Sequence, residues 1–268
     1  MWRERTDAAR RSASTGRAEI ECQNPLAIWR TGTLTGVVIA SKQDPVDLDP
    51  SAAARATPRG ARLIAHRAGN MGSTIPRAVQ VADAIELDVH RFRGRLEVRH
   101  AKVLWPLAMR WDRWELLAGS EPRPTLQHIL EHVPAGTHLW IDLKGATPRL
   151  TRDVLEVVGD RFPLTFSSRA WWILSPARRV AGVRVMRSVG SRLQLWAVQR
   201  SRFRDERHGV AVHERLVSRS SIEQVRPRSG DLVVWAVTDH TRLLELEEVG
   251  VTGFIIDDLE LIEAARRA

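Results

Sequence analysis

Short apolar runs rich in valine, isoleucine and leucine recur from residue 61 onward, and segments with helical spacing separate most of them. Strands that alternate with helices are typical of an α/β fold with a parallel sheet. Eight such runs fit a (β/α)₈ TIM barrel, which usually takes about 250 residues and at least about 200. The predicted strands are Ala61–His66, Ala84–His90, His138–Lys144, Phe162–Phe166, Val183–Ser188, Gly209–His213, Leu232–Val237 and Val251–Asp257.

The segments between these runs carry helix signals. Thr125 and Asp239 are residue types that favour the position just before a helix, and we expect them to cap two of the helices. An open, doubly wound sheet is the alternative fold, although no G-x-G-x-x-G follows a strand. The clearest predicted helices are Thr125–Val133, Arg149–Val158, Ser220–Val225 and Thr241–Val249.

One segment after the second predicted strand breaks the alternation. Residues 91–95 are typical of a turn, and they lead into a short predicted strand at Leu96–His100. A short Trp-rich insertion follows. We expect its aromatic residues to cover the barrel mouth or to pack on a helix. The alternative is that they contact a membrane surface. The insertion holds Trp105, Trp111 and Trp114 and ends near Pro122 and Pro124.

Residues 1–60 differ in composition from the rest of the chain. They carry clusters of serine, threonine, alanine and arginine, and their one apolar stretch, Leu34–Ala40, is interrupted by glycine and threonine. Such a composition offers no core. We therefore expect residues 1–60 to form a disordered or non-core extension and residues 61–268 to form the barrel.

Composition and charge narrow the classes of function. The chain is 43% hydrophobic and 27% charged, with a net charge of +9. Its basic residues are almost all arginine and are spread along the chain, and no nucleic-acid-binding module is recognisable. We therefore expect no nucleic-acid ligand, although the charge is compatible with a phosphate-bearing substrate. Nothing in the sequence indicates an obligate protein partner.

The sequence favours a cytoplasmic location. Cys22 is the single cysteine, so no intramolecular disulfide can form. No uncharged apolar stretch of about 18 residues occurs, and the Arg-rich first residues lack the apolar run of a signal peptide.

Carboxylates gather near the C-terminal ends of the predicted strands, where a TIM barrel holds its catalytic groups. Side chains two positions apart on a strand share a face, so Glu86 and Asp88 point the same way. Asp142 and Lys144 share a face in the same manner. The apolar residues between them point to the opposite face.

Three carboxylates that converge on one barrel mouth predict a metal site. A buried carboxylate is unfavourable unless it is paired or binds a cation, and oxygen ligands suit Mg²⁺ or Ca²⁺. The alternative is a set of exposed charges in which Lys144 makes an ordinary salt bridge. We favour one divalent cation held by Glu86, Asp88 and Asp142, because all three interrupt apolar strands at matching heights.

Two histidines and an arginine accompany these carboxylates. His66 and His100 are the candidate proton carriers, since imidazole titrates near neutral pH. Arg67 can bind a phosphate through its planar guanidinium. We interpret the remaining histidines as structural or solvated; they are His90, His128, His132, His138, His208, His213 and His240.

The ordered set of motifs resembles the glycerophosphodiester phosphodiesterases, from about Ala61 to the C-terminus. This resemblance implies a TIM barrel with one divalent metal held by Glu86, Asp88 and Asp142. It also implies His66 and His100 as the acid–base pair, Arg67 and Lys144 on the phosphate, and Trp235 at the pocket wall. The motifs are Ala65–Ala68, Ile85–His90, Val98–His100, Ile141–Lys144, Val234–Asp239 and Gly250–Asp257.

The reaction that the resemblance implies is the metal-dependent hydrolysis of a glycerophosphodiester to an alcohol and glycerol 3-phosphate. The substrate is then a small phosphodiester or a molecule of the lysophospholipid type. The attacking group is water or a neighbouring hydroxyl of the substrate, and either histidine can be the acid.

Departures from the family pattern keep two alternatives open. Ala68 stands where the family usually has glycine, Asp142 where it usually has glutamate, and the Glu-Asn-Thr signature of the first loop is missing. The aspartate and the short first loop resemble the sphingomyelinase D/phospholipase D branch of the same superfamily, whose members are secreted and disulfide-bonded. The second alternative is a degenerate barrel that binds a phosphate ligand without catalysis.

Overall fold

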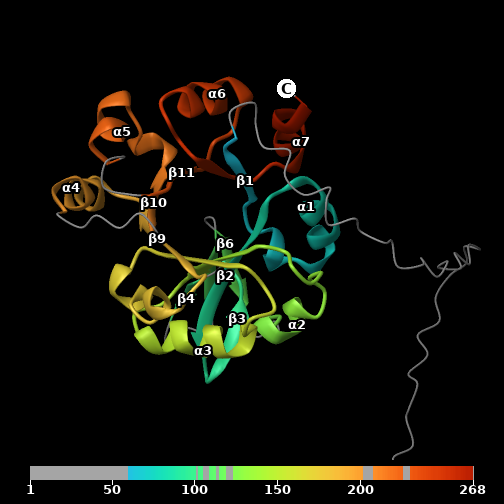
Figure 1. Cartoon of the computed structure of the whole chain (residues 1–268). Helices are drawn as coiled ribbons and strands as arrows, with labels where there is room; N and C mark the ends of the chain where they lie inside the picture. Colours follow the sequence, from blue (N-terminus) through green and yellow to red (C-terminus); the bar gives the residue numbers. More distant parts are fainter. Residues whose placement is uncertain are drawn as a thin grey trace, which may run out of the picture. The chain divides into compact units, whose positions relative to one another are not determined.

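Eight parallel strands close into a barrel (Figure 1). The computed structural model describes residues 60–100, 123–201, 208–225 and 230–267, together with the backbone of three strands between residues 102 and 118. Pairing of the first barrel strand with both the second and the last closes the ring. In barrel order the strands are β1 (Arg62–Ala65), β2 (Ala84–Phe92), β7 (Leu139–Leu143), β8 (Leu164–Ser168), β9 (Arg184–Val189), β10 (Gly209–His213), β11 (Leu232–Trp235) and β12 (Gly253–Ile256).

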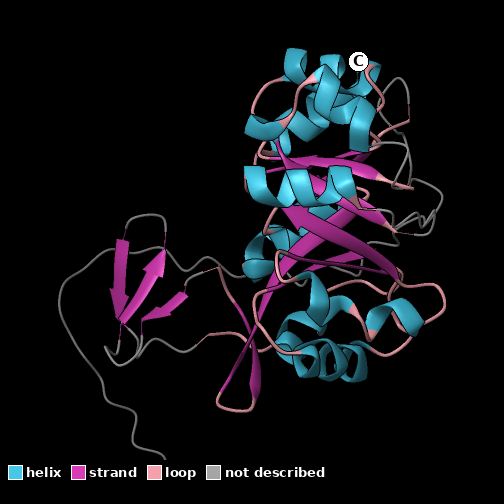
Figure 2. Cartoon of the chain, turned by 90° about the vertical axis from the view of Figure 1, so that its left-hand side faces the viewer, coloured by secondary structure: helices cyan, strands magenta, loops and turns pink. Residues whose placement is uncertain are grey.

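Helices surround the strands, and Figure 2 shows them on both sides of the barrel. The predicted (β/α)₈ barrel is therefore confirmed. On α3, Leu150, Val154 and Val158 recur at helical spacing and are buried. The helices are α1 (Ile75–Val81), α2 (Leu126–Leu130), α3 (Pro148–Val158), α4 (Arg192–Arg200), α5 (Arg219–Val225), α6 (His240–Glu248) and α7 (Leu259–Arg267).

Both predicted helix caps are confirmed. The Thr125 side chain accepts a hydrogen bond from the backbone N–H of His128, and the Asp239 side chain accepts one from Arg242. The helix that begins after Thr125 is shorter than predicted and ends at Leu130. Between β8 and β9, two short 3₁₀ helices, Trp171–Leu174 and Ala177–Arg179, stand in place of an α-helix.

A hairpin extends the second barrel strand. β3 (Arg95–Val98) pairs antiparallel with the end of β2, as the sequence predicts. Arg93 and Gly94 form the turn with φ angles of 49° and 81°, a geometry that suits the twist of a two-residue hairpin.

The Trp-rich insertion holds strands that the sequence analysis did not predict. β4 (Lys102–Leu104), β5 (Met109–Asp112) and β6 (Glu115–Ala118) form a separate antiparallel sheet. Trp111 lies on β5. Trp105 and Trp114 lie outside the described residues, so the membrane-contact alternative stays a prediction.

The boundary between the predicted extension and the barrel also stays a prediction. Residues 1–59 lie outside the described residues, and the barrel begins with β1 at Arg62. Within the described residues, no helix has the length and apolar character needed to span a membrane.

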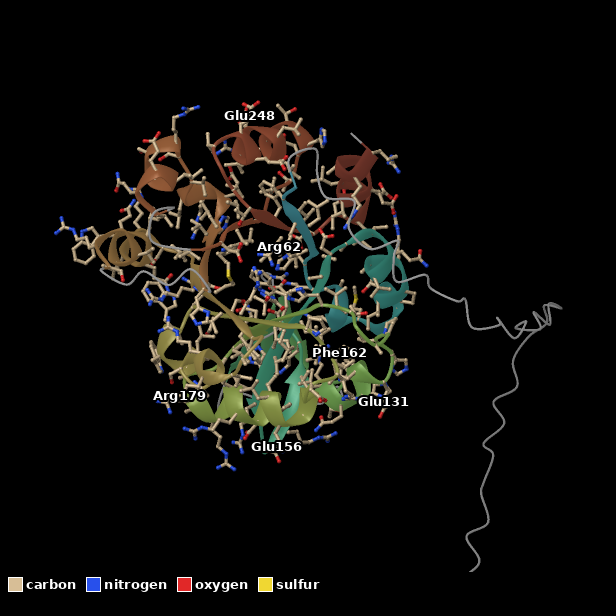
Figure 3. The ribbon with its side chains drawn as sticks, in the orientation of Figure 1. Arg62, Glu131, Glu156, Phe162, Arg179 and Glu248 are labelled. Carbon is tan, nitrogen blue, oxygen red and sulfur yellow. The ribbon has the colours of Figure 1, made fainter. Side chains whose placement is uncertain are left out.

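The alternation of side chains divides the core into two shells. Outward-facing residues such as Leu63, Leu87 and Ile141 are buried beneath the helices. A smaller inner cluster fills the barrel, and it includes Trp140 and Met186. Other charged side chains are exposed, and Figure 3 shows the labelled Glu156, Arg179 and Glu248 at the outer rim; exposed charges of this kind are ordinary.

His138 is a partly buried titratable group at the N-terminal end of β7, whereas the carboxylates lie toward the C-terminal ends of the strands. It precedes β7, and its Nε2 lies 2.9 Å from the hydroxyl of Thr165. Burial, together with Arg62 and Arg184, lowers the pKa of His138 from 6.5 to about 4. The folded protein therefore holds this imidazole neutral in a range where the unfolded chain protonates it.

We predict that His138 destabilises the fold as the pH falls. The folded-state pKa of His138 lies below its unfolded value, so below pH 6.5 the unfolded chain takes up a proton that the folded protein does not. The free energy of unfolding therefore falls as the pH drops from 6.5 toward 4, and His138 has no such effect above pH 6.5. The expected loss is about 2–4 kcal/mol. Urea unfolding of the wild type and of His138→Gln at pH 7 and pH 4 measures this loss. The difference in unfolding free energy between the two proteins isolates His138, because all other titrating groups are common to both. A pH-independent difference would contradict the prediction.

Candidate active site

A cavity of about 320 Å³ lies at the C-terminal ends of the barrel strands. Most of the side chains that line it lie on a barrel strand or follow the end of one. Most of the residues that the sequence analysis singled out meet here. The cavity lining includes His66, Arg67, Glu86, His100, Asp142, Lys144 and Trp235.

Asp88, the remaining predicted residue, lies beneath this lining. It pairs in register with Asp142 on the neighbouring strand, and Glu86 lies two positions before it on β2. One oxygen from each of the three carboxylates lies within 4.8 Å of the others, and all three residues are buried. The predicted carboxylate cluster is therefore assembled in the structure.

Asn70 binds Asp88 at two points. The Nδ2 of its side chain donates a hydrogen bond to Asp88 Oδ2 at 2.8 Å, and the Oδ1 of its side chain accepts one from the backbone N–H of Asp88 at 2.8 Å. The Lys144 ammonium lies 2.9 Å from Asp88 Oδ1. Burial opposes the charge of Asp88, but Lys144 and Asn70 outweigh it and lower the pKa of this carboxyl. Asp88 is therefore held ionised in a fully buried position.

A chain of donors fixes Asp142. The indole N–H of Trp140 donates to the Ser167 hydroxyl at 2.9 Å, and this hydroxyl donates to Asp142 Oδ1 at 2.9 Å. Lys144 contacts the second oxygen of Asp142. Against the opposing effect of burial, Asp142 and Asp88 raise the pKa of Lys144, so the ammonium stays charged.

The three carboxylates fit a divalent cation. Burial, reinforced by Asp88 and Asp142 and opposed mainly by His66, raises the pKa of Glu86 to about 7. Burial is the largest cause of this rise, and the two neighbouring carboxylates add to it because like charges disfavour ionisation. Clustered carboxylate oxygens are the ligands that Mg²⁺ and Ca²⁺ prefer. Glu86, Asp88 and Asp142 can therefore bind such an ion.

His66 lies between two carboxylates. Its Nδ1 lies 2.7 Å from Asp257 Oδ1, and its Nε2 lies 3.2 Å from Glu86 Oε2. Burial disfavours the imidazolium, but Glu86 and the hydrogen bond to Asp257 outweigh burial and raise the pKa of His66 above 6.5. This imidazole is oriented at one nitrogen and faces the carboxylate cluster with the other.

Arg67 adopts a backbone conformation that is rare for a residue with a side chain. Its φ is 55°, and its N–H donates to Glu86 Oε2 at 3.2 Å. The guanidinium Nε lies 3.5 Å from Asp88. Gly69 follows, and a Cβ there would lie 2.3 Å from Leu87. The turn after β1 therefore presses closely against β2 and brings Arg67 to the cavity.

The β2–β3 hairpin carries His100 to the same cavity. The backbone N–H of Arg99, its neighbour, donates to the carbonyl of Asp88 at 2.9 Å. His100 lines this cavity and also a second one of about 630 Å³, which shares His66 and Arg67 with the first. The two predicted proton carriers thus lie at the junction of two cavities.

The sequence analysis missed several residues of this site. Asn70 and Ser167, which hold two of the carboxylates, lie outside the motifs it used. His90, interpreted as structural or solvated, lines the cavity, and burial together with Arg99 lowers its pKa to about 3. Arg169 also lines the cavity. The sequence could have indicated Ser167 and Arg169, because both follow closely after a predicted strand, where a barrel places its functional residues.

Comparison with known proteins gives matches at the level of structure. No protein-family model matches the sequence, and no curated protein matches it. A phosphodiesterase from Oleispira antarctica, solved with its product sn-glycerol 3-phosphate, has a TM-score of 0.59 at 19% identity. That match covers 77% of this chain and 97% of the other.

Two glycerophosphodiester phosphodiesterases give similar values. The enzyme from Thermotoga maritima has a TM-score of 0.55 at 20% identity and covers 75% of this chain and 96% of its own. One from Agrobacterium tumefaciens has a TM-score of 0.53 at 19% identity, with 78% and 100% coverage. The chain therefore shares the fold of the glycerophosphodiester phosphodiesterases, as the sequence motifs predicted.

We predict that Mg²⁺ or Ca²⁺ stabilises the folded protein through the buried carboxylates. At a concentration about 100 times the dissociation constant, binding adds about 2.7 kcal/mol to the free energy of unfolding. Denaturant unfolding with EDTA or with each ion measures the gain, and Asp142→Asn should remove most of it.

Glu131→Gln is the control for this measurement. Glu131 lies with His128 and His132 in an exposed cluster on the outside of the molecule, where a second ion could bind (Figure 3). The control should keep the full gain in stability. If Asp142→Asn also keeps the gain, the ion binds elsewhere.

Proposed function

We propose that this chain is a divergent glycerophosphodiester phosphodiesterase. It hydrolyses a small phosphodiester to an alcohol and glycerol 3-phosphate in a metal-dependent reaction. One observation carries the proposal: three buried carboxylates lie within 4.8 Å of one another, and two of them line a cavity that both His66 and His100 also line. The glycerol 3-phosphate bound to the Oleispira antarctica phosphodiesterase supports the substrate class.

Glu86, Asp88 and Asp142 hold one divalent cation, Mg²⁺ or Ca²⁺, in this proposal. When bound, the ion polarises a phosphoryl oxygen and neutralises charge that develops during cleavage. Asn70 and Ser167 keep two of these carboxylates in place through the hydrogen bonds described above.

Arg67 and Lys144 bind the phosphate. The guanidinium of Arg67 offers a planar pair of donors, and the Lys144 ammonium adds a second positive charge beside it. Trp235 forms the wall on the opposite side of the cavity, where its ring packs 4.1 Å from that of His213. These groups orient the diester so that its phosphorus lies between the two histidines.

His66 and His100 divide the proton transfers. One takes a proton from the attacking oxygen, which is that of water or of a neighbouring substrate hydroxyl, as this oxygen bonds to phosphorus. The bond from phosphorus to the leaving alcohol breaks, and the other histidine protonates the departing oxygen. Asp257 holds the His66 ring in position through Nδ1.

A binding barrel without catalysis is the second candidate, and one contact favours it. The Lys144 ammonium pairs with Asp88 and Asp142 and so neutralises part of the charge that attracts a cation. The buried position of all three carboxylates and the convergence of both histidines favour the hydrolase.

We predict that the protein releases glycerol 3-phosphate from at least one small diester and that EDTA abolishes this activity. Glycerophosphocholine, glycerophosphoethanolamine and glycerophosphoglycerol test the proposal, and added Mg²⁺ or Ca²⁺ should restore the rate. Activity confined to lysophosphatidylcholine or sphingomyelin would favour the sphingomyelinase D/phospholipase D alternative. Binding without turnover would favour the non-catalytic barrel, and activity that survives exhaustive chelation would contradict the metal assignment.

We predict that His66→Ala and His100→Ala each lower kcat by about 10²–10⁴, the usual contribution of a general acid or base. The double variant should be little slower than the slower single variant, because residues that act as a unit lose activity non-additively. Exposed His132 supplies the control, His132→Ala, which should keep the wild-type rate.

Bis(p-nitrophenyl) phosphate separates the two roles. Its leaving group departs without a proton, so this substrate should partly rescue the variant that lacks the acid and leave the other inactive. Near wild-type rates for both single variants on a natural diester would rule out the histidine pair.

A further inference from the structure

The cavity at the barrel mouth has two walls of opposite character. The carboxylates that line it, Glu86 and Asp142, come from β2 and β7. The wall formed by β8 to β11 and the residues that follow them contributes Ser167, Arg169, Ser188, Ala211 and Trp235. Among the described residues of this second wall, one lining residue is a cation and none is a carboxylate.

Arg169 follows β8 and has an exposed side chain that lines two adjoining cavities. Within the described part of the chain, no carboxylate lies within ion-pair distance of its guanidinium. Arg67 and Lys144, by contrast, both pair with Asp88. Among the described residues that line this cavity, Arg67 and Lys144 are paired with a carboxylate and Arg169 is not.

The side chain of Gln194 ties the Arg169 turn to the end of β9. Its Nε2 donates to the Arg169 carbonyl at 3.1 Å, and its Oε1 accepts from the N–H of Gly190 at 3.0 Å. A Cβ at Gly190 would lie 3.0 Å from Arg169 Cζ, so the guanidinium lies against the glycine backbone. These contacts hold Arg169 at the cavity edge.

More positive charge surrounds this position. Arg215 Nη2 donates to the carbonyl of Gly190 at 2.9 Å, on the residue that Arg169 contacts. Burial, then Arg215 and, to a smaller extent, Arg169 lower the pKa of His213. The nearby Glu214 carboxylate is paired with Arg242 at 2.9 Å. This side of the barrel mouth is consequently suited to an anion.

We propose that Arg169 forms an anion subsite and that the preferred diester carries a second anionic group, such as a phosphate, on the alcohol that lies along this wall. A guanidinium binds phosphate oxygens through two parallel hydrogen bonds. The same wall repels a quaternary ammonium such as choline. This inference rests on the proposed function for the placement of the scissile phosphate, but binding at Arg169 can be measured without turnover.

The first test compares three diesters: glycerophosphoglycerol, its analogue whose second glycerol bears a phosphate monoester, and glycerophosphocholine. We expect kcat/KM to be about tenfold higher for the phosphorylated diester than for glycerophosphoglycerol, because a charged hydrogen bond at an exposed site contributes about that factor. Glycerophosphocholine should be the poorest substrate. The same phosphorylated head group on a diacyl lipid in vesicles shows whether the anion comes from a lipid or from a soluble diester.

Variants locate the preference. Arg169→Ala should reduce the advantage of the phosphorylated diester to less than about twofold, and Arg169→Lys should keep part of it, since the ammonium retains the charge without the planar donor pair. Arg152→Ala is the matched control, because Arg152 is an exposed arginine on α3 outside the cavity lining, and it should keep the full advantage.

Calorimetric titration of the full chain in EDTA separates this inference from the proposed function. We expect the phosphorylated diester to bind the wild type about tenfold more tightly than it binds Arg169→Ala. Tighter binding without turnover of any diester would support the subsite and contradict the hydrolase. Turnover without a charge preference, with equal binding by both proteins, would contradict the subsite alone. Neither turnover nor binding would overturn both.

Discussion

The burial of three carboxylates close together in the barrel is the constraint on which the rest of the site depends. Charges removed from water are unfavourable unless other groups compensate them. The contacts around Glu86, Asp88 and Asp142 supply that compensation from three places: the turn after β1, the end of β7 and β8. Asn70, Lys144, Ser167, Arg67 and His66 each direct a donor at the cluster. The site is thus organised around its negative charge.

The same constraint relates the inner shell of the barrel to the cavity above it. Trp140 lies one inward-facing position before Asp142 on β7, where it belongs to the apolar cluster that fills the barrel. Its indole N–H is nonetheless directed upward to Ser167. Trp140 therefore packs in the apolar cluster below the cavity and also donates a hydrogen bond to the hydroxyl that orients Asp142. A substitution at this position would remove both interactions.

The strand framework and its carboxylates could be predicted because both depend on local rules. A period of two places Glu86 and Asp88 on one face whatever the rest of the chain does, and the order of the strands brings Asp142 beside them. Asn70 could not be predicted in this way, since it lies in a turn without periodicity and its contact with Asp88 depends on how that turn packs against β2. Arg169 is similar, because its position depends on Gln194 and Gly190 in the next strand-to-helix connection. The strands of the insertion were missed because their pairing is antiparallel and local, unlike the alternation that surrounds them.

The hydrogen bond between His66 and Asp257 joins residues 191 positions apart, on the first and last strands of the barrel. When synthesis has passed β10, every carboxylate of the cluster has been made, yet β1 still lacks its neighbour β12 and His66 lacks Asp257, the group that orients it. Contacts of such long sequence separation form late, because closing so large a loop is entropically unfavourable until its partners can pack. The carboxylates are therefore synthesised well before Asp257, and the hydrogen bond that orients His66 forms only when β12 has paired with β1.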